Sequence, residues 1–409
     1  MAPVRVSHRT SCRLCGGSRL VRWVHLPLMP LTDDFRVPGD YEDELLYDVD
    51  VYFCKSCHTS QILHDIDYGG YYRNYAFTVG GSPFALKCMS RLAQAALETY
   101  HLKNGCSVVE VGSGDGTQLS FFRDFGARVF GYEPSGALCR ASESIGVPVH
   151  QGLFDEDSTG DIPREFLPVD LLLLTYTFDH IPEPARFLDA ARRILDPDKG
   201  LLIIEVHDLE KILQRREYCL FEHEHAIYLS ALTMQRLLDR CGFSLISTNL
   251  LPESERRGNS LLVVAAPEGS GHSRRALPPL SNPTVEAWTT YESFGEEIHA
   301  AVRKLDHFVD GHAAAGRRLA GYGAGGRGVM TLAAMHSSNE IRYLCDRNPA
   351  FSGRVTPKSH VPVVTPERLE DDPVDVLLVF SFGYIDEIRE HLSRFPRAPQ
   401  EIVSLLDVL

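Results

Sequence analysis

Four cysteines fall in two pairs whose spacing is typical of metal ligands. The pairs are Cys12-x-x-Cys15 and Cys54-x-x-Cys57. Each pair can supply two thiolates to one tetrahedral ion, and two such pairs form the usual four-thiolate zinc pattern. Four protein ligands leave no open position on the metal, so this zinc is expected to be structural. In a reducing cytoplasm such cysteines favour metal over disulfides, and coincidental spacing is the alternative.

A second group of reactive side chains lies in residues 221–230, which read FEHEHAIYLS. Two carboxylates alternate there with two histidines, in the order Glu222, His223, Glu224 and His225. A histidine titrates near neutral pH, and a neighbouring carboxylate such as Glu224 can tune it. The segment therefore predicts a general acid–base site, with a second metal ion as the alternative.

A glycine-rich loop follows an apolar run at Val108–Gly116, which reads VVEVGSGDG. The β-branched valines indicate a buried parallel strand. Gly112, Gly114 and Gly116 allow the backbone to turn sharply and to approach a ligand closely. A helix is expected directly afterwards, so the loop would lie at a strand-to-helix switch point. Dinucleotide enzymes and structural turns share this pattern, but the acidic Glu110 inside it favours a different cofactor.

The next expected strand also ends in an acidic residue. Arg128–Tyr132 precedes Glu133 and Pro134. A carboxylate at this spacing, about twenty residues after the glycines, can accept two hydrogen bonds from a ribose diol. With strands at Asp170–Thr175 and Gly200–Glu205, the order resembles class I S-adenosylmethionine methyltransferases. The resemblance implies S-adenosylmethionine as the cofactor, held by the acidic residue and the glycines of the loop together with Glu133 and Pro134.

Further patterns outline the elements around these sites. Leu26–Phe35, LPLMPLTDDF, is expected to be a proline-interrupted loop, and Leu46–Phe53 alternates as a strand does. Apolar residues at helical spacing predict an amphipathic helix over Pro83–Leu102. Ser260–Ala266 is expected to be the last strand of the cofactor sheet, and the Pro-, Gly- and Ser-rich Pro267–Pro283 a linker.

A second strand followed by a glycine loop opens the last part of the chain at Leu319–Gly328, which reads LAGYGAGGRG. A helix is expected before it, over Trp288–Val309. This loop contains no acidic residue, and the strand after it ends at Asp346. The pattern predicts a Rossmann-like domain to which we assign no cofactor. Its Arg327 could instead help to hold an anionic group of a substrate.

Length and composition fit three domains and exclude some functions. A chain of 409 residues is long enough for two or three domains with sizeable cores. We expect an α/β protein with a zinc-binding domain over 1–70, a class I methyltransferase domain with a Rossmann-like sheet over 71–268, and a C-terminal Rossmann-like domain over 284–409. A formal charge of −14 without a compensating basic patch argues against a nucleic-acid partner. The apolar runs are too short to span a membrane and the N-terminus lacks a signal-peptide core, so a cytoplasmic protein is expected.

Taken together, the zinc knuckles, EVGSGDG, GYEPS, DHIP and EHEHAIYLS resemble the deoxysugar C-methyltransferases of antibiotic pathways. That family includes the tetronitrose, mycarose and noviose enzymes, and the resemblance covers nearly the whole chain. It implies that the acceptor is a nucleotide-linked keto sugar, with dTDP as the nucleotide.

The resemblance also implies roles for individual residues. The family's Glu-His pair falls on Glu224 and His225, its histidine before Ile-Pro on His180, and its loop tyrosine on Tyr75. His225 would then be the base that takes the proton next to the ketone, helped by Glu224. Tyr75 and His180 would position or stabilise the oxyanion.

Three positions depart from the family pattern. Glu222 stands where a tyrosine is usual, Phe77 where a second loop tyrosine is common, and Phe351 where a lysine is common. The additional carboxylate of Glu222, also a candidate site residue, would change which hydroxyl, amine or carbonyl the site accepts. The specific sugar therefore does not follow from the resemblance.

The sequence thus predicts an S-adenosylmethionine-dependent C-methyltransferase of antibiotic biosynthesis, acting through an enolate. An O- or N-methyltransferase, in which His225 deprotonates a hydroxyl or an amine, is one alternative. A non-catalytic protein that uses the zinc module and a degenerate cofactor fold for protein contacts is another. We expect a monomer without a nucleic-acid or membrane partner.

Overall fold

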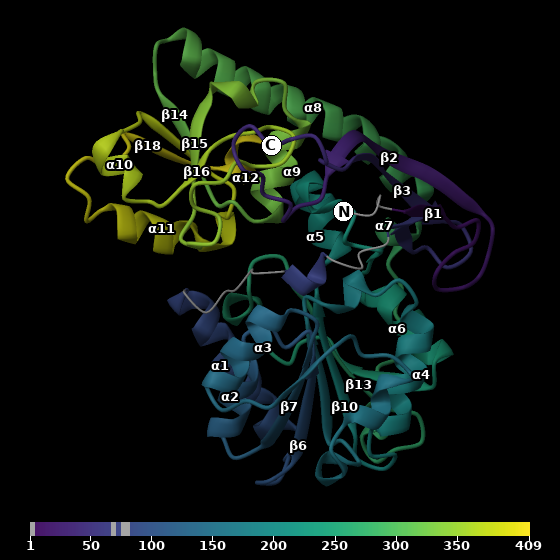
Figure 1. Cartoon of the computed structure of the whole chain (residues 1–409). Helices are drawn as coiled ribbons and strands as arrows, with labels where there is room; N and C mark the ends of the chain where they lie inside the picture. The colour runs from purple at the N-terminus through teal and green to yellow at the C-terminus, as the bar shows by residue number, and fades with distance from the viewer. Residues whose placement is uncertain (1–4, 67–70, 75–81) are drawn as a thin grey trace. The chain divides into compact units, whose positions relative to one another are not determined.

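The computed structural model describes residues 5–66, 71–74 and 82–409 (Figure 1). Its chain forms two compact units, and neither is continuous in sequence. Unit 1 comprises Met1–Leu20, Cys54–Leu209 and Ala226–Glu286. Unit 2 comprises Val21–Phe53, Glu210–His225 and Ala287–Leu409. The two short segments Val21–Phe53 and Glu210–His225 therefore fold with the C-terminal part of the chain.

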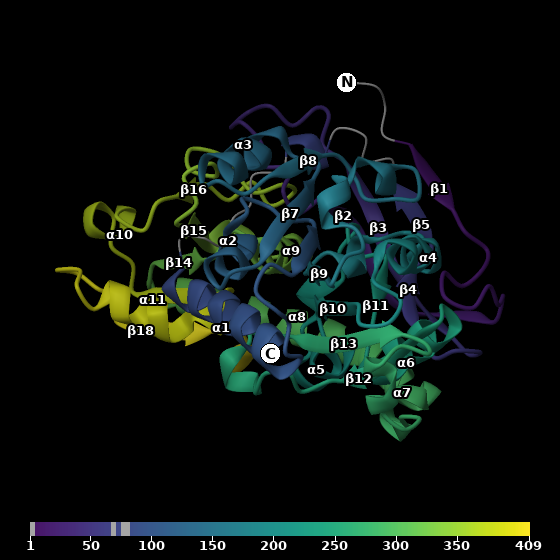
Figure 2. The ribbon, with the colours of Figure 1, turned by 90° about the horizontal axis from the view of Figure 1, so that it is seen from below.

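Unit 1 contains a seven-stranded sheet in the order β12-β13-β10-β9-β6-β7-β8. Its strands are β6 Ser107–Val111, β7 Arg128–Glu133, β8 Val149–Gln151, β9 Leu171–Thr175, β10 Leu201–Val206, β12 Phe243–Ser247 and β13 Leu261–Pro267. Neighbouring strands are parallel, except that β13 is antiparallel to both β10 and β12. Strands β12 and β13 lie at one edge of the sheet (Figure 2). The order reverses between β6 and β9, and open α/β sheets bind ligands at such a switch point. This sheet confirms the predicted α/β class.

Helices cover both faces of the sheet of unit 1. They are α1 Pro83–Thr99, α2 Thr117–Asp124, α3 Gly136–Ser144, α4 Pro184–Ile194 and α6 Ala231–Arg240; the short α7 Pro283–Glu286 also belongs to unit 1. Val108 shares one core with Leu92 of α1 and Leu119 of α2, while Val109 shares the other with Leu188 of α4. Alternate residues of a strand face opposite sides, so one valine run supplies both cores. Figure 1 shows α1, α2 and α3 on one face and α4 and α6 on the other.

The N-terminal part of unit 1 consists of short strands. Strand β1, Val6–His8, pairs with β5, His64–Ile66, in antiparallel register. Strand β4, Ser60–Ile62, pairs with β11, Ile227–Tyr228, also antiparallel. The pairing of β4 with β11 places residues 227–228 next to the strand that follows the Cys54-x-x-Cys57 motif.

Unit 2 contains a five-stranded parallel sheet in the order β16-β15-β14-β17-β18. Its strands are β14 Leu319–Tyr322, β15 Ile341–Cys345, β16 Val363–Val364, β17 Val376–Val379 and β18 Glu401–Ser404. Its helices are α5 Leu209–Arg215, α8 Trp288–Ala314, α9 Gly326–Ala334, α10 Arg368–Asp371, α11 Ile385–Leu392 and α12 Leu405–Val408. The first strand, β14, is central, and its glycine loop leads into α9, as a Rossmann-like domain requires. Among the described helices, none has the length and apolarity of a membrane span.

Residues from both ends of the chain pack together in unit 2. Arg36 forms a β-bridge with Val355, and the ring of Phe35 stacks on that of Phe351 with centroids 4.2 Å apart. The backbone N–H of Lys358 also donates a hydrogen bond of 2.6 Å to Glu44. Phe351, which replaces the family's common lysine, is thus a buried packing residue.

The prediction of a loop over Leu26–Phe35 is wrong in its first half. Residues up to Pro30 belong to β2, Leu20–Pro30, which is the neighbour of β3, Leu46–Cys54. Strand β2 is the end strand of its sheet, and prolines are tolerated on such an edge. Leu28 has a φ of 51° there, and its N–H donates to Asp48 at 2.9 Å.

Candidate active site

The four predicted metal ligands converge in unit 1. The sulfur atoms of Cys12, Cys15, Cys54 and Cys57 lie within 4.8 Å of one another. Cys12 Sγ is 3.5 Å from Cys57 Sγ, and Cys15 Sγ is 3.6 Å from Cys54 Sγ. Four sulfurs bound tetrahedrally to zinc at about 2.3 Å are separated by about 3.8 Å. The cluster therefore has the size of a four-thiolate zinc site.

Polar contacts around the sulfurs favour thiolates. The N–H of Gly17 donates to Cys15 Sγ at 3.4 Å, and Gln61 Nε2 donates to Cys12 Sγ at 3.0 Å. The contact with Cys57, aided by Gln61, lowers the pKa of Cys12 to about 4, while the same contact raises the pKa of Cys57. The pair thus shares one proton, which a bound metal ion replaces.

The three loop glycines of unit 1 serve two different purposes. A Cβ at Gly112 would lie 2.3 Å from Thr177 Oγ1, and one at Gly116 would lie 2.5 Å from Ser142 Oγ. These two glycines let the loop pack against the segment after β9 and against α3. At Gly114 no atom of the described residues lies within 4 Å of such a Cβ. The space over Gly114 is open, as a loop that a ligand approaches requires.

Glu133 connects this loop to the end of β7. Its Oε2 accepts a hydrogen bond of 3.0 Å from the N–H of Gly114, and its Oε1 accepts one of 2.7 Å from the N–H of Ser135. Pro134, which stands between Glu133 and Ser135 in the chain, is half-buried. Burial raises the pKa of Glu133. Each carboxylate oxygen has a further lone pair, so Glu133 can still accept hydrogen bonds from a diol.

Glu110 lies in β6 and is only 1% exposed. The hydroxyl of Thr175 donates to its Oε1 at 3.0 Å. Its Oε2 is buried and has no hydrogen-bond partner among the described residues. Burial raises the pKa of Glu110 to about 8. A buried carboxyl oxygen of this kind suits a cationic partner such as the ammonium group of S-adenosylmethionine. This oxygen and the open space beside Gly114 show that the predicted cofactor residues fit S-adenosylmethionine.

The segment after β9 brings further polar residues to this edge of the sheet. Nδ1 of the predicted His180 lies 3.1 Å from the hydroxyl of Tyr72. Its neighbour Asp179 is buried and lies 3.1 Å from His207 Nδ1. Tyr72 belongs to an aromatic-rich stretch of sequence whose tyrosines are candidate ligand contacts, whereas no sequence pattern pointed to His207, although it directly follows a strand whose carboxyl end faces the ligand edge. The predicted Tyr75, like Phe77, lies outside the described residues.

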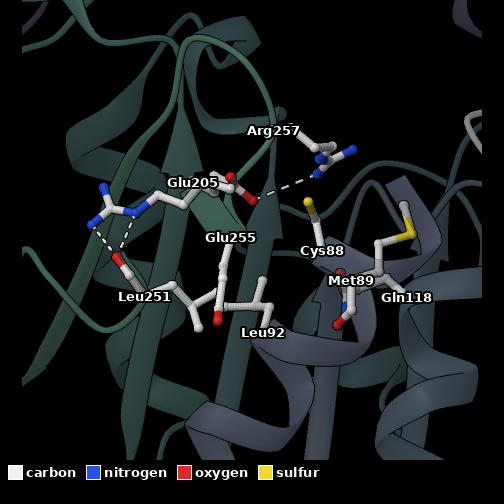
Figure 3. A pocket seen from close by; sticks show the side chains of 9 residues that line it. Cys88, Met89, Leu92, Gln118, Glu205, Leu251, Glu255 and Arg257 are labelled. Atoms are coloured by element: carbon white, nitrogen blue, oxygen red, sulfur yellow. Dashed lines mark hydrogen bonds and ion pairs between the residues drawn. The ribbon is translucent and has the colours of Figure 1, made fainter. Parts of the chain in front are cut away.

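A small cavity lies beside the carboxyl end of β10 (Figure 3). Arg257 contacts Glu205 there at 3.6 Å, and Ser260 donates to the same carboxylate at 2.7 Å. The lining residues are Cys88, Met89, Leu92, Gln118, Glu205, Leu251, Glu255, Arg256 and Arg257. This set is distinct from the predicted cofactor residues.

The two histidines of the acid–base segment have different contacts within unit 2. His223 Nε2 donates to the carbonyl of Met29 at 2.9 Å, and burial lowers its pKa. His225 Nδ1 donates to the carbonyl of Leu220 at 2.9 Å. A carbonyl oxygen can only accept, so the proton of neutral His225 is on Nδ1 and the lone pair is on Nε2. This tautomer is the one that a base acting through Nε2 needs.

The carboxylates of this segment are anchored by residues far away in sequence. Glu224 Oε1 accepts hydrogen bonds from the N–H of Thr32 at 2.8 Å and from its hydroxyl at 2.9 Å. Glu222 is 6% exposed, and its carboxyl group lies against Gly326, the first residue of α9. Burial raises the pKa of Glu222 to about 8. No local pattern in the sequence links Thr32 or Gly326 to this segment.

Arg327 follows Gly326 in unit 2 and has partners within the protein. Its Nη2 lies 3.5 Å from the buried Glu217, and its guanidinium lies over the ring of Phe382 at 4.9 Å. Glu217 is shared with Arg215, whose Nη1 also lies 3.5 Å from it. A role of Arg327 in holding a substrate anion stays a prediction.

Comparison with protein families matches three successive parts of the chain. Residues 12–72 match a zinc binding domain, residues 85–248 a methyltransferase domain, and residues 277–406 the C-methyltransferase C-terminal domain. The first match contains the four clustered cysteines, and the second contains the glycine loop with Glu110 and Glu133. These matches and the geometry confirm the predicted zinc site, the methyltransferase fold and the S-adenosylmethionine cofactor.

Comparison with individual proteins gives a relative along nearly the whole chain. C-methyltransferase NovU of Streptomyces niveus is 28% identical over 396 residues, which are 94% of this chain and 92% of the relative. The plantazolicin methyltransferase BpumL in complex with SAH is 12% identical, with 46% of this chain and 86% of that chain covered and a TM-score of 0.37. Magnesium protoporphyrin IX methyltransferase (ChlM) from Synechocystis PCC 6803 with bound SAM is 12% identical, with 49% and 90% covered and a TM-score of 0.34.

Proposed function

We propose that this chain, which belongs to the family of S-adenosylmethionine-dependent C-methyltransferases, methylates a carbon next to the ketone of a dTDP-linked deoxysugar. The observation that carries the proposal is the buried His225, whose tautomer leaves the lone pair on Nε2. The sugar acceptor and a place in antibiotic biosynthesis rest on the resemblance of the segments DHIP and EHEHAIYLS to those of the deoxysugar C-methyltransferases. The protein would work as a monomer with its domains at 1–70, 71–268 and 284–409.

Residues of unit 1 would hold the cofactor. When bound, S-adenosylmethionine supplies a methyl group that its sulfonium makes electrophilic. Glu110 would hold the ammonium through its buried Oε2, and Glu133 would accept hydrogen bonds from the ribose diol. The open space over Gly114 would let the methionine part approach the backbone.

Residues around the ketone would generate the nucleophile. His225 would take the α-proton on Nε2, and the electron pair of the broken C–H bond would move into the carbonyl as an enolate. Glu224, oriented by Thr32, would support this base. Tyr75 and His180 would stabilise the oxyanion. The enolate carbon would be the nucleophile for the methyl group, whose bond to sulfur would break to leave S-adenosylhomocysteine, and His225 would return its proton to solvent.

Mass spectrometry of the acceptor tests the proposal. A dTDP-keto-deoxysugar should gain one methyl group only when S-adenosylmethionine and the enzyme are both present. The matched control is the same sugar with its ketone reduced to a hydroxyl, which cannot form an enolate and should not react. Methylation of the reduced sugar would support the O-methyltransferase alternative. If calorimetry detects no binding of S-adenosylmethionine, every methyltransferase function is excluded.

A further inference from the structure

Arg257 places a mostly buried guanidinium group at the ligand edge of the sheet of unit 1. Its side chain is 12% exposed, and its Cζ lies 4.3 Å from the centroid of the ring of Tyr176. Tyr176 directly follows β9, and the hydroxyl of Thr175, the last residue of that strand, donates to Glu110 at 3.0 Å. Burial raises the pKa of Glu110, and the positive charge of Arg257 acts in the opposite direction. The guanidinium therefore lies near the carboxyl group that would hold the ammonium of the cofactor.

The neighbouring strand β10 orients this guanidinium. Glu205, which is opposite Thr175 in the register of β10 and β9, contacts Arg257 Nη2 at 3.6 Å. The same carboxylate accepts a hydrogen bond of 2.7 Å from Ser260 and one of 3.4 Å from Tyr176. A guanidinium has five N–H donors in a rigid fork, so it can hold Glu205 and a second carboxylate at the same time. The ion pair thus fixes Arg257 without excluding an anionic ligand.

Arg257 and the helix after the glycine loop line the same small cavity (Figure 3). Gln118, in the first turn of α2, also lines it and is 3% exposed. Its Nε2 donates to the carbonyl of Met89 at 3.0 Å, and this bond determines which way the amide points. Gln118 Oε1 is buried and has no hydrogen-bond partner among the described residues. The lining thus combines a cationic donor with a buried acceptor.

A ligand with an ammonium and a carboxylate on one carbon matches this set of groups. The methionine part of S-adenosylmethionine is such an amino acid, and the buried Glu110 Oε2 and Gln118 Oε1 are acceptors for its ammonium. We propose that Arg257, oriented by Glu205, is a cofactor-binding residue that holds the carboxylate of this methionine part. The inference rests on the cofactor site of the proposed function and not on its sugar acceptor. Without Arg257, the carboxylate would meet only the like charges of the two glutamates.

Decarboxylated S-adenosylmethionine, which lacks only the carboxylate, tests the assignment by calorimetry without any acceptor. Wild type should bind S-adenosylmethionine about ten- to a hundredfold more tightly than the decarboxylated form, because charge-assisted hydrogen bonds are lost with the carboxylate. Equal affinity for the two ligands would overturn the proposal without any variant. If wild type binds neither of them, the cofactor site of the proposed function fails instead. The two failures are therefore distinguishable.

Two variants separate Arg257 from the ion pair that orients it. Glu205→Gln keeps an acceptor for Ser260 and needs no cation, so it should keep the preference for S-adenosylmethionine over the decarboxylated form. Adding Arg257→Leu removes the guanidinium without leaving Glu205 as a buried unpaired charge, and the preference should disappear. A preference that persists in the double variant would overturn the proposal.

Methylthioadenosine, which has no amino acid part, shows whether the rest of the cofactor site is intact. Its affinity should be the same in Glu205→Gln and in the double variant, because Arg257 would not contact it. An equal loss of affinity for methylthioadenosine and for S-adenosylmethionine in the double variant would mean that Arg257 supports the fold of the site. That result would also overturn the proposal.

Arg256 provides the matched control, since it lines the same cavity but holds backbone groups. Its Nε donates to the carbonyl of Leu251 at 2.7 Å, and its Nη2 donates to the carbonyl of Thr248 at 3.2 Å. Arg256→Leu should therefore unfold at a lower temperature and keep the preference for S-adenosylmethionine. Loss of the preference in Arg256→Leu, but not in the double variant, would assign the carboxylate to Arg256 and contradict the role of Arg257.

Discussion

The backbone N–H of Gly114 donates a hydrogen bond of 3.0 Å to Glu133 Oε2. The glycine loop after β6 and the acidic residue at the end of β7 are thereby joined in one site, although a helix separates them in the chain. Gly114 has a φ of 56° and open space beside it, so its replacement should affect a bound ligand more than the packing of the sheet.

Gly114→Val should abolish measurable cofactor binding while the protein stays folded. The branched side chain would enter the space over the loop and would cost about 1–2 kcal/mol of backbone strain. Calorimetry with S-adenosylmethionine measures the effect. Gly105→Ala is the matched control, since Gly105 also has a positive φ, 81°, and open space where a Cβ would lie. It should lose similar stability and keep its affinity. Unchanged affinity in folded Gly114→Val would mean that the cofactor lies elsewhere.

Below pH 8, binding of S-adenosylmethionine should release the proton of Glu110. Its pKa is raised to about 8 without ligand, and a bound ammonium favours the ionised form. Affinity should therefore fall as the pH drops from about 8 to 6, by at most about tenfold per pH unit. Calorimetry in buffers of different ionisation enthalpy counts the protons released. Glu110→Gln should bind more weakly and with a flatter pH dependence; equal proton release in both proteins would refute this role.

Freshly purified protein should contain one zinc ion per chain, a stoichiometry set by the four clustered sulfurs. Cys54→Ser should lose the metal and unfold at lower temperature, because binding of structural zinc contributes to the folding free energy. Metal analysis and thermal unfolding measure both effects. Cys241→Ser, which changes a buried cysteine outside the cluster, should keep its zinc. Well under one zinc in wild type would count decisively against the site.

His225→Ala should lose about a hundred- to ten-thousandfold in kcat, the usual contribution of a general base. Its affinity for S-adenosylmethionine should remain nearly unchanged. His223→Ala is the matched control: loss of the hydrogen bond to Met29 should lower stability by about 1 kcal/mol and spare most of the turnover. The opposite result, with His223 essential and His225 dispensable, would show that the base is assigned wrongly.

Local sequence patterns predicted the parts that local chemistry determines. Valines followed by glycines at 108–116 specified a buried strand and its loop, because both depend on neighbouring residues alone. The C-x-x-C pairs specified the metal ligands, since few other arrangements use that spacing. The edge strand β2 was missed because its prolines are allowed only by its position in the sheet.

Contacts between distant segments could not be predicted in the same way. Thr32 anchors Glu224 across 192 positions, and Gly326 makes room for Glu222 only because their elements fold into one unit. The hydroxyl of Tyr72 faces His180, whereas the predicted Tyr75 lies outside the described residues. Burial raises the pKa of Glu222, and a sequence gives no direct measure of burial.

The position of the transferred methyl group tests the central claim most directly. The enzyme would be incubated with a dTDP-keto-deoxysugar and S-adenosylmethionine carrying a ¹³C-labelled methyl group, and the product examined by NMR. C-methylation predicts a methyl signal coupled through one bond to a ring carbon next to the former ketone. A labelled methyl group on an oxygen or a nitrogen of the sugar would contradict the account.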